Sequence, residues 1–133
     1  MRDDNLRVAL LRHWAASDAN NFTAEHHIYR ADAVLEYPQS GERISGRDNI
    51  QASRVAQPNA KRFTVQRILG SGNIWISELV LTYDEQPSYV VNIMEFEGGK
   101  VVRETQYFGE PFAPGPSRTQ WVKLMNDPNQ RIR

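Results

Sequence analysis

The first part of the chain carries its apolar residues at helical spacing. Leu6, Leu10 and Trp14 succeed one another every four residues, behind acidic and amide residues suited to capping a helix. This spacing predicts a helix at the N-terminus. The segment FTAEHHIYRAD, 22–32, is expected to form a second, short helix, and GRDNIQASRVAQ, 46–57, a third that stops before proline.

From residue 61 onward the apolar period becomes two, which is typical of strands. The turn signals SG, DEQP and GG separate four such runs: KRFTVQRILG, NIWISELVLTY, SYVVNIMEFE and KVVRETQYFG. An earlier strand is predicted in AVLEY before Pro38, followed by a short one near Arg43 and Ile44. Helices first and strands afterwards predict an α+β domain, with helices covering one face of an antiparallel sheet.

The length and the distribution of polar residues favour one domain. A chain of 133 residues can bury a core and enclose a pocket within it. We expect residues 1–133 to form a single domain with its core over 5–112. A loop and a short helix around Trp121 are expected over 111–126, and a polar tail over 127–133.

Composition narrows the classes of partner. Sixteen basic and sixteen acidic residues give a net charge of zero, which supplies no field for phosphates and argues against nucleic acid as a partner. The absence of cysteine excludes disulfides and thiolate chemistry and suits the cytoplasm. No signal peptide or membrane span is evident. His26 and His27 lie about 100° apart on a helix and cannot readily share a metal, so we expect no metal site and no cofactor.

Two stretches together carry a family resemblance. They are LLRHWAASDANNFTAEHHIYRADAVLEYPQSGERISGRDNI and the hairpin that closes on GGKVVRETQYFGE. In order and spacing they resemble the nuclear transport factor two-like superfamily, which includes ketosteroid isomerases and SnoaL-like polyketide cyclases. The resemblance implies a cystatin-like α+β barrel: a cone-shaped, curved antiparallel sheet wrapped around N-terminal helices. It also implies a pocket for a small apolar organic ligand and a homodimer formed through the outer sheet face.

The resemblance does not extend to the residues of a steroid isomerase. The position of the isomerases' general base, directly before a proline, is Tyr37, and a phenol with a pKa near 10 is a poor base at neutral pH. The position of their second acid is Asn92, and that of their helix-one tyrosine is His13. We therefore expect a different activity, because this fold hosts isomerases, hydrolases, cyclases and binding modules.

The resemblance implies that Asn92 points inward, and the two-residue period of a strand then assigns the other side chains to the inner or the outer face of the sheet. The residues then expected inside are Val90, Met94, Phe96, Val102, Glu104, Gln106, Phe108, Trp75, Ser77, Leu79, Leu81 and Tyr83. Those expected outside are Val91, Ile93, Glu95, Val101, Arg103, Thr105, Tyr107, Ile74, Ile76, Glu78 and Val80. Both faces are apolar, which predicts a partner on the outer one. Arg103 lies across the hairpin as an ion-pair partner for Glu95 or Glu78.

Glu104 is the candidate acid of the pocket. A buried carboxylate near a histidine can be tuned for general acid–base chemistry, and His13 is its expected companion. Two alternatives stay open: Glu104 lines the pocket without reacting, or it forms a structural ion pair with Arg54. The residues expected to contact a ligand are Asn92, Tyr37, Tyr29, Arg54, Trp14, Trp75, Met94 and Phe108.

Three functions follow from this reading. The first is a cofactor-independent isomerase, cyclase or hydrolase, in which Glu104 shuttles a proton, His13 assists, and Asn92 or Tyr37 binds a polarised oxygen. The second is a ligand-binding module without chemistry. The third is an interaction domain that uses its outer sheet face.

Overall fold

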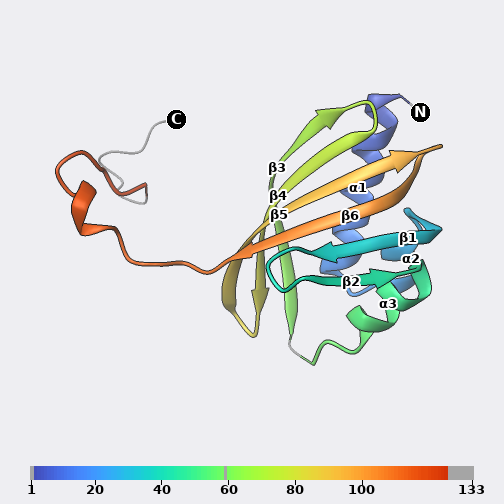
Figure 1. Cartoon of the computed structure of the whole chain (residues 1–133), viewed down its shortest axis with the longest axis horizontal. Helices are drawn as coiled ribbons and strands as arrows, with labels where there is room; N and C mark the ends of the chain where they lie inside the picture. Colours follow the sequence, from blue (N-terminus) through green and yellow to red (C-terminus); the bar gives the residue numbers. More distant parts are fainter. Residues whose placement is uncertain (1, 59, 126–133) are drawn as a thin grey trace.

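The computed structural model describes residues 2–58 and 60–125, so the polar tail expected over 127–133 lies outside the described residues. Two helices, a pair of strands and a third helix precede a long antiparallel meander (Figure 1). In chain order the elements are α1 (Asp3–Asp18), α2 (Phe22–His26), β1 (Tyr29–Tyr37), β2 (Glu42–Ser45), α3 (Arg47–Val55), β3 (Lys61–Ser71), β4 (Ile74–Tyr83), β5 (Gln86–Glu97), β6 (Lys100–Gly109) and the 3₁₀ turn η1 (Pro116–Arg118).

The strands form one curved six-stranded sheet in the order β2-β1-β6-β5-β4-β3. Every neighbouring pair is antiparallel except β1 and β6, which run parallel. In Figure 1, α1 lies behind the sheet, and it packs against β3 while α3 packs against β1. The helices and the inner face of the sheet share one hydrophobic core. The expected α+β cone is confirmed, with a parallel pair in place of a purely antiparallel sheet.

The predicted parity holds along β4 and β5 and through most of β6. Asn92 and Met94 are fully buried, whereas Val91 and Glu95 are not. The prediction fails at the start of β6, where Val101 is buried and Val102 is only half-buried. A β-bulge explains the change: Glu95 pairs with Arg103 but the next residue, Phe96, pairs with Val101, which leaves Val102 as the extra residue.

The ion pairs on the outer face follow the predicted sides of the strands. Arg103 lies 3.6 Å from Glu95 across the hairpin, so this pairing is confirmed. Glu78 pairs with Arg67 of β3 at 2.9 Å instead. Both pairs are largely exposed to solvent, where an ion pair contributes at most about 1 kcal/mol. They are surface features of the sheet.

Two local predictions are wrong. The second helix ends at His26, and Tyr29 already belongs to β1, because only one turn of helix fits before the chain enters the sheet. Trp121 does not lie in a helix: within 111–125 the regular structure is the single turn η1, and the indole is 74% exposed. After β6 the chain continues in an extended stretch that runs away from the end of the sheet (Figure 1).

The hairpin from β4 to β5 is set by its two turn residues. Asp84 and Glu85 have φ values of 49° and 69°, the left-handed conformation that a two-residue hairpin turn needs. Gly70 in β3 has a different reason. A Cβ there would lie 2.5 Å from the backbone oxygen of Ile74, so only glycine lets the two strands approach this closely.

Candidate functional site

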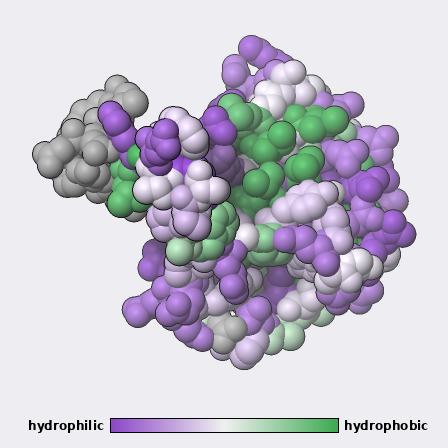
Figure 2. Space-filling view, turned by 60° about the vertical axis from the view of Figure 1, so that its left-hand side comes forward, coloured by the Kyte–Doolittle hydropathy of each residue, from purple (hydrophilic) through white to green (hydrophobic). Residues whose placement is uncertain are grey.

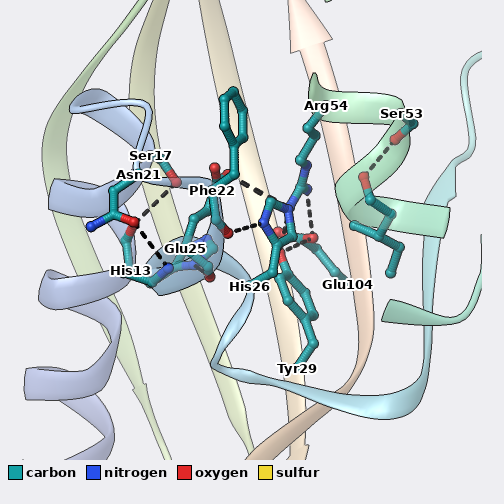
Figure 3. Close-up of polar contacts among 12 residues, drawn as sticks. His13, Ser17, Asn21, Phe22, Glu25, His26, Tyr29, Ser53, Arg54 and Glu104 are labelled. Atoms are coloured by element: carbon teal, nitrogen blue, oxygen red, sulfur yellow. Dashed lines mark hydrogen bonds and ion pairs between the residues drawn. The ribbon is translucent and has the colours of Figure 1, made fainter. Parts of the chain in front are cut away.

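Arg54, in the last turn of α3, ties the helix to β1 and β6. Its Nη1 donates to the hydroxyl of Tyr29 at 2.8 Å, and its Nη2 donates to Oε1 of Glu104 at 2.8 Å. The Tyr29 hydroxyl in turn donates to the same carboxylate oxygen at 2.6 Å. Three elements therefore meet in a closed triangle of hydrogen bonds (Figure 3).

The second oxygen of Glu104 is also held. The Nε2 of Gln106 donates to Oε2 of Glu104 at 3.4 Å and to Oδ1 of Asn92 at 3.0 Å. The Glu104 side chain is completely buried. Asn92 is equally buried, and its Nδ2 has no hydrogen-bond partner among the described residues. Glu104 thus receives hydrogen bonds from three side chains, and the ion pair with Arg54, left open as an alternative, is present.

The electrostatics of this cluster favour a charged guanidinium beside a neutral phenol. Burial opposes the charge of Arg54, but Tyr29, Glu104 and Glu25 outweigh it and hold the pKa of Arg54 well above its ordinary value. Burial also raises the pKa of Tyr29 well above its ordinary value. At neutral pH, Tyr29 is therefore a hydrogen-bond donor to Glu104.

Glu25 of α2 is a second buried acid near Arg54, and the sequence analysis missed it. Its Oε2 lies 3.8 Å from Nη1 of Arg54, and its Oε1 lies 3.9 Å from Nζ of Lys61. Oε1 has no hydrogen-bond partner among the described residues. The helical spacing that places Phe22 and His26 on one side also places Glu25 there, so the signal was present in the sequence.

Lys61, at the start of β3, shares the surroundings of Glu25. Its ammonium lies 5.3 Å from the ring centre of Phe22 and 5.2 Å from that of Phe63, which are cation–π distances. Burial lowers the pKa of Lys61, and the carboxylate of Glu25 opposes this effect. Lys61 and Glu25 thus form an ion pair at the inner wall.

His13 of α1 touches Glu25 through the backbone. Its Nδ1 lies 2.7 Å from the carbonyl oxygen of Glu25. Because a carbonyl only accepts, Nδ1 carries the proton and Nε2 is left as an acceptor, which has no partner among the described residues. Burial, followed by the charge of Arg54, lowers the pKa of His13 to about 4. The imidazole is thus neutral at pH 7, and it lines a separate groove with Arg12, His27 and Lys100.

A cavity of about 160 Å³ lies between α1, α3 and the inner face of the sheet. Arg54 and Glu25 contribute to its polar wall. The lining residues are Trp14, Glu25, Tyr37, Ile44, Ser53, Arg54, Gln57, Lys61, Phe63, Leu81, Tyr83, Gln106 and Phe108. An apolar hollow with a few convergent charged groups is the usual form of a small-molecule site.

The structure divides the sequence-predicted site residues into three groups. Four line the cavity: Trp14, Tyr37, Arg54 and Phe108. Four are buried and do not line it: Glu104, Asn92, Tyr29 and Met94. His13 faces the groove described above, and Trp75 lies at the other end of the sheet, where its indole nitrogen donates to the carbonyl oxygen of Gly72 at 3.0 Å.

No metal or membrane site emerges from the described part of the chain. Over residues 2–58 and 60–125, no three histidine or acidic side chains are grouped as a metal ion would require. Across the same residues, none of the helices combines the length and the apolar character needed to cross a bilayer.

Similarity to other proteins covers most of the chain. Residues 9–104 match the model of the SnoaL-like domain. An NTF-2 like protein of unknown function from Burkholderia xenovorans LB400 is 53% identical, with a TM-score of 0.87 over 93% of this chain and 98% of that one. A putative ketosteroid isomerase from Kribbella flavida is 24% identical, with a TM-score of 0.86 over 100% of this chain and 99% of the other.

A more distant structure shares the fold alone. The LEH-like epoxide hydrolase of M. tuberculosis is 19% identical, with a TM-score of 0.66 over 80% of this chain and 84% of that one. No curated protein matches the chain in sequence. With the cone, its cavity and the match over residues 9–104 in agreement, the chain belongs to the SnoaL-like domain family of the nuclear transport factor two-like superfamily.

Proposed function

We propose that the protein is a cofactor-independent enzyme of the isomerase, cyclase or hydrolase type, which acts on a small apolar molecule by general acid–base chemistry. One observation carries the proposal: the cavity combines aromatic walls with the buried, charged cluster around Arg54. A carboxylate and a cation fixed in a water-poor site are the groups that proton transfer needs.

The size of the cavity limits the substrate. An apolar cavity of about 150 Å³ accommodates a benzene molecule, and the volume here is about 160 Å³. A single ring therefore fills it, and any larger part of a substrate extends through the mouth. Trp14, Phe63 and Phe108 supply the apolar walls for that ring.

The roles assigned to Glu104 and His13 remain proposals. Glu104 accepts hydrogen bonds from Arg54 and Gln106, and these two residues line the cavity. His13 forms a hydrogen bond with the backbone of Glu25, which also lines the cavity. Tyr37 is itself part of the cavity wall, and burial raises the pKa of its hydroxyl, which keeps the proton that it can donate to a substrate oxygen.

A ligand-binding module is the second candidate function. The hydrogen bonds that Glu104 receives from three side chains favour it, because an acid with so many donors is typical of a structural pair. Such a module would bind the same single-ring molecules without converting them.

The two functions separate in one assay. The purified protein is mixed with single-ring enones, epoxides and lactones, and both the melting temperature and the formation of product are followed. Enzyme function predicts a ligand-dependent rise in melting temperature together with product. A rise without product favours the binding module, and no rise with any compound would contradict both functions.

Two variants on α3 test whether binding and turnover take place in the cavity. Ser53 and its neighbour Ala52 are both exposed to solvent, but only Ser53 lines the cavity. Ser53→Phe fills the cavity and should abolish binding and turnover. Ala52→Phe adds the same ring outside the cavity and should leave both unchanged.

We also propose a homodimer in the cytoplasm that forms through the outer sheet face. Ile74, Ile76, Tyr89, Val91 and Tyr107 leave 37–55% of their surfaces exposed there. Figure 2 shows a hydrophobic patch on the side of the molecule turned toward the viewer. A contiguous apolar patch of this kind marks an association surface.

Light scattering tests the dimer. The unmodified protein should have the mass of two chains, and Val91→Glu should have the mass of one, because a buried, unpaired charge opposes association. Leu11→Glu, at an exposed position of α1, is the matched control and should remain dimeric. A monomeric unmodified protein would contradict the proposal.

A further inference from the structure

Two buried carboxylates flank Arg54, and they differ in how well they are satisfied. Glu104 accepts hydrogen bonds from Tyr29, Arg54 and Gln106. Glu25 has cations at 3.8 Å or more, and its Oε1 accepts no hydrogen bond among the described residues. A buried acceptor without a donor is costly to keep, so Glu25 is the less well satisfied of the two acids.

The same two acids differ in their access to the cavity. Glu25 is part of the cavity wall, whereas Glu104 is not. Arg54 and Gln106 both line the cavity and both donate to Glu104. A general base must lie within hydrogen-bond reach of the proton that it removes. Glu25 meets this geometric condition more directly than Glu104.

The charges around the cavity cancel. Arg54 and Lys61 carry positive charges, and Glu25 and Glu104 carry negative ones. Burial lowers the pKa of both His13 and His26, so these imidazoles are neutral at pH 7. A ligand with a net charge would leave one charge without a partner in a poorly solvated site. The cluster therefore suits a neutral ligand.

Resting on the proposed function, we infer that Glu25 is the catalytic residue that takes a proton from a neutral, single-ring carbonyl compound, and that Glu104 is a positioning residue for Arg54. The carboxylate of Glu25 removes a proton from the carbon beside the carbonyl group. The electron pair of that C–H bond forms the C=C bond of an enolate, and the C=O electron pair moves onto oxygen. The Lys61 ammonium, 3.9 Å from Glu25, donates a hydrogen bond to that anionic oxygen.

The reaction is completed without a co-reactant. Glu25 returns its proton to the same carbon, which gives exchange with solvent, or to a conjugated carbon, which gives a shifted double bond. Glu104 takes no proton in this step. It fixes the guanidinium of Arg54 against the cavity wall through the 2.8 Å hydrogen bond.

Cyclohexanone in deuterium oxide is the probe. Proton NMR follows the loss of the signal from the hydrogens beside its carbonyl group. The unmodified protein should accelerate this exchange, and Glu25→Gln should slow the catalysed rate by about 100-fold or more, the range that one general base contributes. Glu25→Asp keeps the carboxylate and should retain part of the rate. Glu95→Gln, on the outer face, should exchange as the unmodified protein does.

Binding is measured separately from the shift of the Trp14 indole resonance on addition of cyclohexanone. Binding without any accelerated exchange overturns the inference and leaves a binding function standing. The inference is equally overturned if Glu25→Gln exchanges at the unmodified rate, or if cyclohexanone does not bind. If cyclohexanone does not bind, the assay with enones, epoxides and lactones still tests the proposed function.

A charged probe tests the choice of a neutral ligand without relying on turnover. Glu25→Gln removes one negative charge and leaves the cluster positive. Cyclohexanecarboxylate should then bind this variant about 10-fold more tightly than it binds the unmodified protein, the effect of about 1.4 kcal/mol. Cyclohexanone should bind both proteins with similar affinity. Equal binding of cyclohexanecarboxylate by both proteins would overturn the charge argument.

Discussion

Arg54 lies between two buried carboxylates, those of Glu104 and Glu25, which differ in their hydrogen bonds and in their position relative to the cavity. On the β6 side, Glu104 receives hydrogen bonds at 2.6, 2.8 and 3.4 Å and lies behind the cavity wall. On the α2 side, Glu25 belongs to the wall, and its Oε1 has no donor among the described residues. A carboxylate with several hydrogen-bond donors stabilises the fold, whereas one that lacks donors and lines a cavity is better placed to interact with a ligand. Burial alone does not distinguish them, because both are buried.

Removal of Glu104 should have the largest effect on stability. Glu104→Ala leaves the guanidinium of Arg54 buried without its closest anion and should lower the free energy of unfolding by about 3–5 kcal/mol. Urea denaturation measures the change. Glu95→Ala, whose carboxylate is 3.6 Å from Arg103 on the outer face, should cost less than about 1 kcal/mol. Equal losses for the two variants would show that the buried carboxylate of Glu104 matters no more to stability than a surface carboxylate.

Acid should act through His13 of α1, whose ring contacts the backbone of Glu25. The pKa of His13 is lowered from 6.5 to about 4, chiefly by burial. The unfolded chain binds this proton at the ordinary pKa, so the free energy of unfolding is highest above pH 6.5 and falls as the pH drops toward 4. The loss that His13 contributes is about 3 kcal/mol.

Urea denaturation at several pH values across that interval checks the effect. His13→Asn keeps a donor for the carbonyl oxygen of Glu25 but does not titrate, so its stability should depend less on pH. Identical pH dependence of the two proteins would mean that His13 is not the source.

Loss of the Tyr29 hydroxyl should have an intermediate effect. Tyr29→Phe removes a donor to Glu104 and an acceptor for Arg54, and should lower the free energy of unfolding by about 1–3 kcal/mol. Tyr107→Phe is the matched control on the outer face, where the side chain is 42% exposed and no change is expected. Thermal and urea unfolding should agree on the difference between the two variants.

A smaller effect on stability than that of Glu104→Ala is expected at Glu25. Glu25→Gln keeps the shape of the side chain, and Oε1 accepts no hydrogen bond that could be lost. The cations nearest to Glu25 lie at 3.8 and 3.9 Å, so the free energy of unfolding should fall by less than in Glu104→Ala, even where the exchange of cyclohexanone is lost. A loss as large as that of Glu104→Ala would show that both sides of Arg54 are structural.

The sequence predicted the parts of the fold that depend on local periodicity. With the inward direction of Asn92 taken from the family resemblance, alternation along β4 and β5 correctly placed Leu79 and Met94 inside, because one register assigns every residue of a strand to a face. It also brought Arg54 and Glu104 forward as a pair. It failed at Val102, where a bulge changes the register, since nothing in the local pattern requires an extra residue there.

The site was harder to predict because depth and position along the cone are tertiary properties. Trp75 points inward as expected but lies near Gly72, beyond the reach of the cavity. Glu25 was not predicted, because its burial depends on how α2 packs between α1 and α3. The two-residue period of a strand predicts which side chains point inward, but it does not predict which of them line the cavity.

The parallel pairing of β1 with β6 has a consequence for the order of folding. Tyr29 and Glu104 lie 75 residues apart, and the β1 edge can join the sheet only after the last strand is available. Closing so long a stretch of chain is entropically costly and slows folding. During synthesis on the ribosome, α1, α2, α3 and the β3–β5 meander emerge before β6. The triangle of Arg54, Tyr29 and Glu104 is therefore among the last structures to form, and a truncated chain that lacks β6 has no means of completing it.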